Sequence, residues 1–347
     1  MRLFAIVLVA ISVVTAGCAG SADSATTDAQ GRTVLRYQGS PSAVLWPELA
    51  EALGYFHKVT LKWVGDTTSG PQDVQSVATS QTDVGSAFNG SVAKLQAAGA
   101  KITAVLSSNG SDTDTFYGYY SLEGSGIDNP RDLIGKKIGI NTLGAYHEYA
   151  IKEWLHRAGL ADADIKQVQL VVVPPLNTEQ ALREHQIDVG NLGTIIKDVA
   201  LEHGGLHEVF RDTDLIGNFS FSTTVLRDDF IAQNPEAVRD FVAGTARAIR
   251  WAQLHSPAEV VAKFVEIING RDHSKNVDFV KHYKSTGIQT PGGVIAANEF
   301  KLWDDEGVRL GLLEPGLDEN KLFTNEFNPY SNGTYAPDAD ENGKAIH

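Results

Sequence analysis

Short apolar runs, polar loops and amphipathic segments follow one another along most of the chain. Residues 137–140 form an apolar run, residues 141–144 a polar loop, and residues 146–158 carry apolar side chains at helical spacing. The same order of strand, loop and helix is expected at residues 33–53, 59–80, 83–98 and 168–202. This alternation predicts an α/β fold in which mixed, mostly parallel sheets are flanked by helices.

Two of these units are similar to each other. Residues 81–85 are Gln-Thr-Asp-Val-Gly and residues 186–190 are Gln-Ile-Asp-Val-Gly, and each is followed by a polar turn and a helix that ends in glycine. Since one unit lies in each half of the chain, we expect two similar lobes that face each other.

The boundaries of these lobes follow from the order of the predicted elements. We expect lobe 1 to consist of residues 33–118 together with 220–328, and lobe 2 of residues 119–219. The chain then crosses between the lobes near residues 117–121 and again near residues 217–223. Two crossovers side by side are typical of a hinge.

The first 17 residues are typical of a secretion signal. Arg2 precedes an apolar run at residues 3–14, which is too short to span a bilayer, and Val-Thr-Ala-Gly-Cys follows it. Cys18 ends this motif and is the only cysteine of the chain. The motif resembles the lipobox of bacterial lipoproteins, so we expect lipidation of Cys18 and anchoring on the outer face of the cytoplasmic membrane. An ordinary signal peptide is the alternative.

The segments outside the predicted lobes are polar. Residues 18–32 are small and polar and predict a flexible tether, and residues 329–347 predict a tail that is frayed or draped over the surface. A single cysteine allows no disulfide within the chain. The lobes therefore depend on their apolar cores for stability.

Charge and motifs exclude several classes of function. The net charge is −14, and Lys and Arg are scattered, which argues against nucleic acid as a partner. The chain has no P-loop, no Gly-X-Ser-X-Gly and no second histidine to complete a zinc motif at His147. We therefore expect no metal, no cofactor and no enzymatic activity, and we expect a monomer that meets the membrane only through Cys18.

Several motifs together resemble one family of transport proteins. They are the lipobox, Gly-Tyr-Phe at 54–56, AAGAKITAV at 97–105, NPRDLIGKKIGINTLGAYHEYAIKEWLHRAGL at 129–160, ALREHQIDVGNLG at 181–193 and FIAQNPEAVRDFVAG at 230–244. The chain resembles the solute-binding lipoproteins of ABC importers in the nitrate/sulfonate/taurine group, which have the type II periplasmic-binding-protein fold. The resemblance covers most of residues 33–270. It implies two lobes that close on one small molecule and deliver it to the permease and ATPase subunits of an importer.

The resemblance also implies that ligand contacts come from loops at the carboxyl ends of strands in both lobes. In the first lobe these positions are Gln38, Ser40, Trp46, Thr67, Thr68, Phe88, Asn89, Tyr117 and Tyr119. In the second lobe and at the crossover they are Asn141, Thr142, Ala145, Tyr146, His147, Asn191, Thr194, Asn218, Phe219 and Ser220. These loops contain no Lys or Arg, so backbone N–H groups and hydroxyls would have to hold an anion.

Two classes of ligand are compatible with such loops. The resemblance implies an aliphatic sulfonate or a taurine-like anion, whereas the many aromatic side chains also suit an aromatic carboxylate or a thiamine-precursor pyrimidine. We expect the polar head of the ligand at the helix start near Ala145 and Thr142, with Asn89 and Gln38 opposite and Trp46 or Tyr146 covering the body. An enzyme with the same fold is a further alternative, but the pyrimidine-forming enzymes of this fold carry a Cys-rich motif, which this chain lacks.

Overall fold

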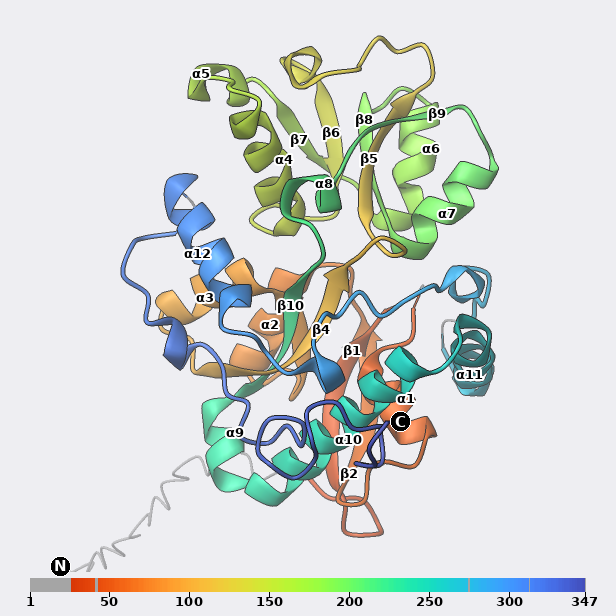
Figure 1. The fold of residues 1–347 in the computed structure, drawn as a ribbon, viewed down its shortest axis with the longest axis vertical. Coiled ribbons are helices and arrows are strands. Elements are labelled where there is room, and N and C mark those ends of the chain that lie inside the picture. Colours follow the sequence, from red (N-terminus) through yellow and green to blue (C-terminus); the bar gives the residue numbers. More distant parts are fainter. Residues whose placement is uncertain (1–25, 41–42, 274, 312, 347) are drawn as a thin grey trace, which may run out of the picture.

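The computed structural model describes residues 26–40, 43–273, 275–311 and 313–346. The predicted signal peptide, Cys18 and most of the predicted tether therefore lie outside the described residues. The described chain forms two halves, one above the other in the view of Figure 1, and each is built on its own β-structure with helices packed on it. Within the described residues, no helix has the length and apolar character needed to cross a bilayer.

The lower half contains two groups of strands. β1 (Thr33–Gly39) pairs in parallel with β2 (Val59–Asp66). The second group has the order β3-β10-β4, with β3 at Gly85–Phe88, β10 at Phe219–Arg227 and β4 at Ile102–Ser111. A parallel bridge between Tyr37 and Val84 joins the two groups.

The upper half is built on a five-stranded sheet. Its order is β7-β6-β8-β5-β9, with β7 at Gln169–Val172, β6 at Lys137–Ile140, β8 at Val189–Gly193, β5 at Tyr117–Leu122 and β9 at Leu206–Arg211. β6 runs parallel to both neighbours, whereas β5 is antiparallel to β8 and to β9. The mixed α/β architecture predicted from the sequence is confirmed.

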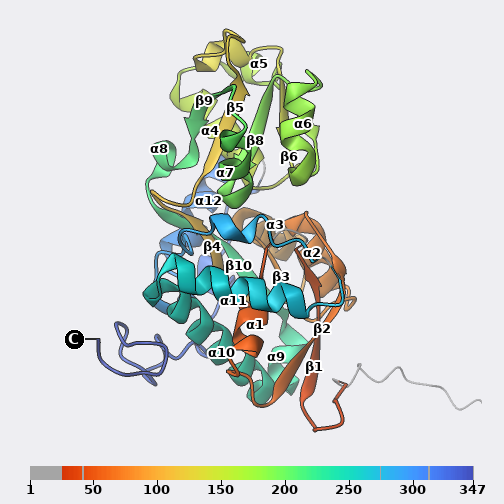
Figure 2. The same cartoon turned by 90° about the vertical axis from the view of Figure 1, so that its right-hand side faces the viewer.

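Helices cover both β-structures (Figures 1 and 2). The α-helices of the lower half are α1 (Trp46–Ala52), α2 (Gly70–Ala78), α3 (Asn89–Ala97), α9 (Asp228–Gln233), α10 (Pro235–Leu254), α11 (Pro257–Gly270) and α12 (Asn298–Arg309). Those of the upper half are α4 (Tyr146–Arg157), α5 (Asp162–Ile165), α6 (Thr178–Arg183), α7 (Thr194–Glu202) and α8 (Asp212–Ile216). The short 3₁₀ helices are η1 (Pro130–Leu133), η2 (Pro175–Asn177), η3 (Val280–His282), η4 (Pro291–Gly293) and η5 (Glu319–Lys321).

The chain passes between the halves at two places. The first passage is residues 112–116, because β4 ends at Ser111 in the lower half and β5 begins at Tyr117 in the upper sheet. Residues 117–121, predicted as a crossover, are instead strand residues of the upper half. The second passage follows α8 and enters β10 at Phe219, within the predicted range.

A buried carboxylate links these two passages. Asp212 begins α8 and is fully buried. Its Oδ2 accepts hydrogen bonds from the Ser111 hydroxyl at 2.6 Å and the Tyr146 hydroxyl at 2.8 Å, and its Oδ1 accepts one from the Tyr117 N–H at 3.2 Å. The Asp212 side chain thus bonds the residues at both ends of the first passage, Ser111 and Tyr117. Asp212 itself begins α8, the helix that leads into the second passage.

The two Asp-Val-Gly motifs have the same structural task. Asp83 precedes β3 and accepts a hydrogen bond at 2.8 Å from the backbone N–H of Arg36 in the neighbouring β1. Asp188 precedes β8 and accepts one at 2.8 Å from the backbone N–H of Lys137 at the start of β6. The similarity of the two motifs therefore reflects an aspartate whose carboxylate accepts a hydrogen bond from the backbone of the adjacent parallel strand.

The carboxyl-terminal segment is held more firmly than the sequence predicts. Tyr330 and Ala339 are buried in the core around α10. From α10, the Arg250 side chain donates to the Ala339 carbonyl and the Arg247 side chain donates to the Glu341 carbonyl, both at 2.8 Å. The segment is therefore draped over the lower half and not frayed, because arginines of α10 satisfy its carbonyl groups.

Candidate functional site

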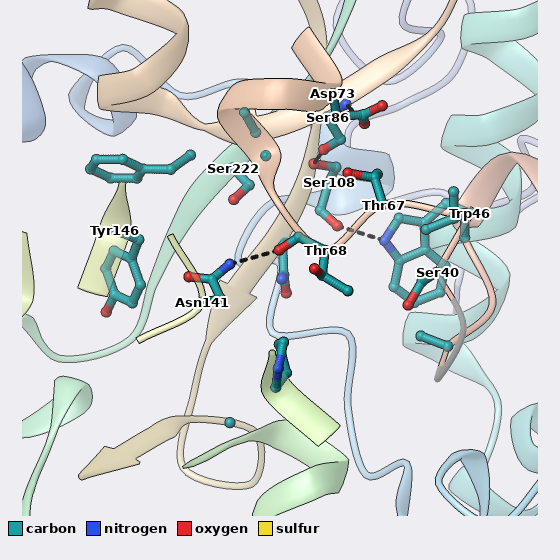
Figure 3. Close-up of a pocket in the computed structure, with 18 of the residues that line it drawn as sticks. Ser40, Trp46, Thr67, Thr68, Asp73, Ser86, Ser108, Asn141, Tyr146 and Ser222 are labelled. Atoms are coloured by element: carbon teal, nitrogen blue, oxygen red, sulfur yellow. Dashed lines mark hydrogen bonds between the residues drawn. The ribbon is translucent and has the colours of Figure 1, made fainter. Parts of the chain in front are cut away.

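A cavity of about 450 Å³ lies between the two halves. Its lining comes from the ends of β1, β2, β3 and β4 below and from the ends of β6 and β8 and the starts of α4 and α7 above. Of the ligand-binding residues expected from the sequence, the lining contains Gln38, Ser40, Trp46, Thr67, Thr68, Phe88, Tyr117, Asn141, Ala145, Tyr146, His147 and Asn191. These residues come from both halves, and Figure 3 shows several of them around the cavity.

Asn89 is placed differently from the prediction. No loop separates β3 from α3, because Phe88 ends the strand and Asn89 begins the helix. The Asn89 side chain is fully buried and donates to the Glu299 carbonyl at 3.1 Å. It therefore joins α3 to α12 and does not reach the cavity.

Other expected residues also lie outside the lining. Tyr119 stacks on Phe210 with ring centroids 4.0 Å apart, the Thr142 hydroxyl accepts from Ser69, and the Ser220 hydroxyl accepts from the Gln289 N–H. Phe219 packs in the apolar core of the junction between the halves, and Asn218 is exposed before β10. Thr194 begins α7, and its side chain is outside the described part of the structure.

Several lining residues were not anticipated from the sequence. They are Asp73 in the first turn of α2, Ser86, Ser108 and Ser222 on the central strands, and residues 282–286 after α11. Asp73 lies in the first turn of the helix expected within residues 59–80, and this position at a helix start is the signal in the sequence that could have identified it. Residues 282–286 lack periodicity and reach the cavity only through the tertiary fold.

One wall of the cavity is a fixed aromatic ring. Trp46 begins α1, and its indole N–H donates to the Ser108 carbonyl at 2.8 Å (Figure 3). Its ring also lies against Phe264, with centroids 6.3 Å apart. Because the polar edge is hydrogen-bonded and one side is packed, the orientation of the ring is fixed before any ligand arrives.

The opposite wall is an aromatic group around Tyr146. Its ring stacks on Phe221 with centroids 4.3 Å apart, and Phe88 and Tyr117 lie near it at 5.6 and 5.8 Å. Its hydroxyl is used by Asp212, so Tyr146 presents apolar ring surface to its surroundings. Burial raises the pKa of Tyr146 well above its usual value, and the phenol therefore remains protonated.

The titratable groups of the lining give it an acidic character. Among the described residues the lining contains three aspartates, Asp73, Asp114 and Asp198, and one Lys or Arg side chain, Lys284. The Lys284 ammonium lies 2.7 Å from Asp198 Oδ2, so its charge is already paired. Burial lowers the pKa of His147 to about 3, and this imidazole is neutral. An anionic ligand would therefore meet no unpaired Lys or Arg side chain among the described residues of this lining.

The helix start at Ala145 is also partly occupied. Glu148, in the first turn of α4, accepts a hydrogen bond at 2.8 Å from the backbone N–H of Gly144. It also pairs with Lys152 at 2.6 Å. The Glu148 carboxylate thus already interacts with the partial positive charge at the start of α4. This is the position at which we expected, from the sequence, the polar head of the ligand.

Five buried polar atoms of the lining have no hydrogen-bond partner in the described protein. They are Gln38 Oε1, Asp73 Oδ1, Asn141 Oδ1, Asn191 Nδ2 and the Tyr283 hydroxyl. Buried polar atoms are rarely left unpaired, because each unmade hydrogen bond costs about 1–3 kcal/mol. They come from both halves, as expected of a site that a bound molecule completes.

The sequence matches a family model described as "NMT1/THI5 like" over residues 48–259. A Brucella abortus protein whose name assigns it a binding role is 27% identical over 204 residues, which are 58% of this chain and 60% of that protein. The chain thus spans about 60% of the length of this relative. The 4-amino-5-hydroxymethyl-2-methylpyrimidine phosphate synthase THI12 of Saccharomyces cerevisiae is 26% identical over 294 residues, covering 80% of this chain and 82% of the enzyme.

Solved structures show the same fold. The ligand-binding component of an ABC-type import system from Staphylococcus aureus superposes with a TM-score of 0.65 at 14% identity, covering 85% of this chain and 97% of that one. The periplasmic aliphatic sulphonate binding protein of Escherichia coli superposes with a TM-score of 0.63 at 18% identity, covering 84% and 92%. The chain therefore has the fold of the periplasmic binding proteins.

Proposed function

The chain belongs to the NMT1/THI5-like family, and from this membership we propose that it is an extracytoplasmic solute-binding protein of an ABC importer. It captures one small organic molecule in the cavity between its halves and delivers it to the permease. The observation that carries this proposal is the cavity of about 450 Å³, which both halves line and which contains unpaired buried polar atoms from each. A cavity of this size matches the pockets that hold small organic ligands.

Two classes of ligand remain candidates within this proposal. The solved sulphonate-binding protein of the same fold supports an aliphatic sulfonate or a taurine-like anion. The pyrimidine phosphate synthases among the relatives support a flat, nitrogen-containing ring such as a thiamine-precursor pyrimidine. The fixed Trp46 ring and the aromatic group at Tyr146 suit the flat ring better than a small alkyl sulfonate.

Catalysis is the second candidate function, since named relatives are synthases. The described lining offers few groups for it, because His147 is buried and neutral and Lys284 is paired with Asp198. Among the described residues, no group of three or more His, Cys, Asp and Glu is placed to hold a metal ion. Mass spectrometry of a bound compound after long incubation separates the two functions: a binding protein releases it unchanged, whereas an enzyme releases a product.

Anchoring to the membrane belongs to the same proposal. We expect cleavage after residue 17 and lipid on Cys18, with the following polar residues as a tether. Both lobes would then lie outside the cytoplasmic membrane, where an importer receives its solute.

A thermal-shift screen of the purified protein tests the proposed function. The panel contains aliphatic sulfonates, taurine, aromatic carboxylates and aminopyrimidines. A ligand at a hundred times its dissociation constant should raise the free energy of unfolding by about 2.7 kcal/mol and hence the melting temperature. Absence of any shift across the panel at millimolar concentration would contradict a binding role for these solutes.

A further inference from the structure

Asp73 is a buried acidic side chain of the cavity lining. It lies in the first turn of α2, is 6% exposed, and its Oδ2 accepts a hydrogen bond from the backbone N–H of Ser86 at 2.7 Å. Its Oδ1 is buried and has no hydrogen-bond partner in the described protein. Oδ2 is therefore held in place, whereas Oδ1 is left without a hydrogen-bond partner in the described protein.

The groups around Asp73 cannot satisfy its free oxygen. The Ser86 hydroxyl donates to the Thr223 carbonyl at 3.1 Å, and the Ser108 hydroxyl lies 2.6 Å from Ser86 Oγ, so these two hydroxyls are paired with other atoms (Figure 3). Within the described residues, Asp73 forms no ion pair with Lys, Arg or His. Burial accordingly raises the pKa of Asp73 to about 7.

Other unpaired atoms of the lining are acceptors as well. The amide orientation of Asn141 is fixed, because its Nδ2 donates to the Thr68 carbonyl at 2.9 Å and Oδ1 is left without a partner. Gln38 Oε1 is a further unpaired acceptor, whereas Asn191 Nδ2 and the Tyr283 hydroxyl are the unpaired donors among the described lining atoms. The described lining thus presents more unpaired acceptors than donors.

The excess of unpaired acceptors over unpaired donors in the described lining favours one class of candidate ligand over the other. A sulfonate head carries only acceptor oxygens and a negative charge, so it would leave the Asp73 and Asn141 oxygens unpaired and would be repelled by an ionised Asp73. An amidine, or an aminopyrimidine with its amino group beside a ring nitrogen, donates N–H bonds in the plane of a flat body. The Trp46 ring can cover such a body.

We propose that the solute is a flat amidine-like or amino-substituted nitrogen heterocycle whose N–H groups bind Asp73, and that Asp73 sets the preference for it over sulfonates. This inference rests on the proposed solute-binding function and names the chemistry of its ligand. Asp73 contacts the ligand directly, and the Ser86 N–H holds the carboxylate in the required orientation.

Two probes with the same body and opposite heads test the inference in the full-length protein. Benzamidine donates N–H bonds and is cationic, and benzenesulfonate only accepts them and is anionic. A third probe, 4-amino-5-hydroxymethyl-2-methylpyrimidine, donates through a neutral amino group. Calorimetry should give at least one N–H-donating probe an affinity about tenfold or more above that of benzenesulfonate.

The variant Asp73→Asn tests the role of the carboxylate. Its amide oxygen can still accept from the Ser86 N–H, which leaves the NH₂ group in place of the free oxygen. Binding of the N–H-donating probe should fall about tenfold or more, and benzenesulfonate should bind no more weakly than before. Asp66→Asn is the matched control, since Asp66 is exposed at the end of β2 and lies outside the lining. It removes the same charge and should change each affinity less than about twofold.

Each other result contradicts the inference. Tighter binding of benzenesulfonate than of both donor probes, or equal losses in Asp73→Asn and Asp66→Asn, would overturn it while leaving the solute-binding function in place. No binding of any of the three probes, while another compound of the thermal-shift panel binds, would do the same. Failure of the whole panel would instead overturn the proposed function. The comparison of probes on the unaltered protein decides the point even if Asp73→Asn does not fold.

Discussion

Asn141 donates a hydrogen bond from Nδ2 to the carbonyl of Thr68 at 2.9 Å, and this bond joins the two halves of the protein at the rim of the cavity. Asn141 follows β6 in the upper half and Thr68 follows β2 in the lower half. Beside them, the Ser69 hydroxyl donates to Thr142 Oγ1 at 3.3 Å. The loops after two strands thus hold the halves in a closed arrangement.

This contact predicts how the variant Asn141→Ala behaves. Loss of a hydrogen bond that exists only when the halves are closed should destabilise the closed complex by about 1 kcal/mol. Surface plasmon resonance should show ligand dissociation about fivefold faster, with the association rate changed much less. Asn320→Ala, at an exposed position remote from the cavity, is the control. An unchanged dissociation rate in Asn141→Ala would show that the bond does not hold the ligand in.

The two passages between the halves predict a change of shape. Residues 112–116 and the residues between α8 and β10 connect halves that otherwise have separate sheets. Without ligand we expect a population of open molecules, because closure brings together cavity atoms that are unpaired until a ligand binds. Small-angle scattering should give a smaller radius of gyration at saturating ligand. The same radius with and without ligand would argue against closure.

Glu299 predicts a pH dependence of stability. It lies in the first turn of α12, is buried, and accepts a hydrogen bond from the Ser107 hydroxyl at 2.5 Å. Burial raises its pKa from 4.5 to about 7, so between these values the folded state holds a proton that the unfolded state has lost. The free energy of unfolding should therefore fall as the pH rises from about 4.5 to about 7.

The variant Glu299→Gln should remove this contribution. Urea unfolding at pH 5 and pH 7.5 should show a difference in free energy of unfolding that is smaller than in the unaltered protein, by on the order of 3 kcal/mol at most. The remaining slope comes from other buried acids, since burial also raises the pKa of Asp212 to about 6. An identical pH dependence in the two proteins would mean that Glu299 is not protonated in the folded state.

The amino-terminal motif predicts a lipid anchor. Cys18 is the only cysteine and the only acceptor for lipid in the expected motif. In a bacterial host, Cys18→Ser should abolish incorporation of labelled palmitate and release the folded protein from the membrane fraction. Equal labelling of Cys18→Ser and the unaltered protein would show that the motif is not a lipobox.

The sequence predicted the elements best where local patterns decide them. The strand at residues 137–140 agrees with the apolar run, and the helix after Gly144 begins at Tyr146. The α/β class followed from such units because each needs a sheet to cover its apolar face. The helix α12 was missed, although its buried residues Phe300 and Trp303 have helical spacing, because the surrounding residues 271–328 otherwise contain few regular patterns.

The candidate site was predictable in outline but not in its chemistry. Polar loops after strands located Thr68 and Asn141, because the carboxyl ends of β2 and β6 face the cavity from the two halves. The same reasoning placed Asn89 in a loop, although α3 begins there and turns its side chain toward α12. The role of Asp73 depends on which neighbours use their hydrogen bonds, and that is a property of the tertiary structure alone.

Central to the proposed function is a single ligand that lies between the two halves and contacts both. Calorimetric titration of the unaltered protein, Trp46→Ala and Asn191→Ala with the best ligand of the screen tests this most directly. Trp46 lines the cavity from the lower half, and Asn191 lines it from the upper half with an unpaired Nδ2. We predict one site per chain and a loss of about 1–3 kcal/mol in binding free energy for each variant. Wild-type affinity in both variants, with the fold intact, would contradict the claim.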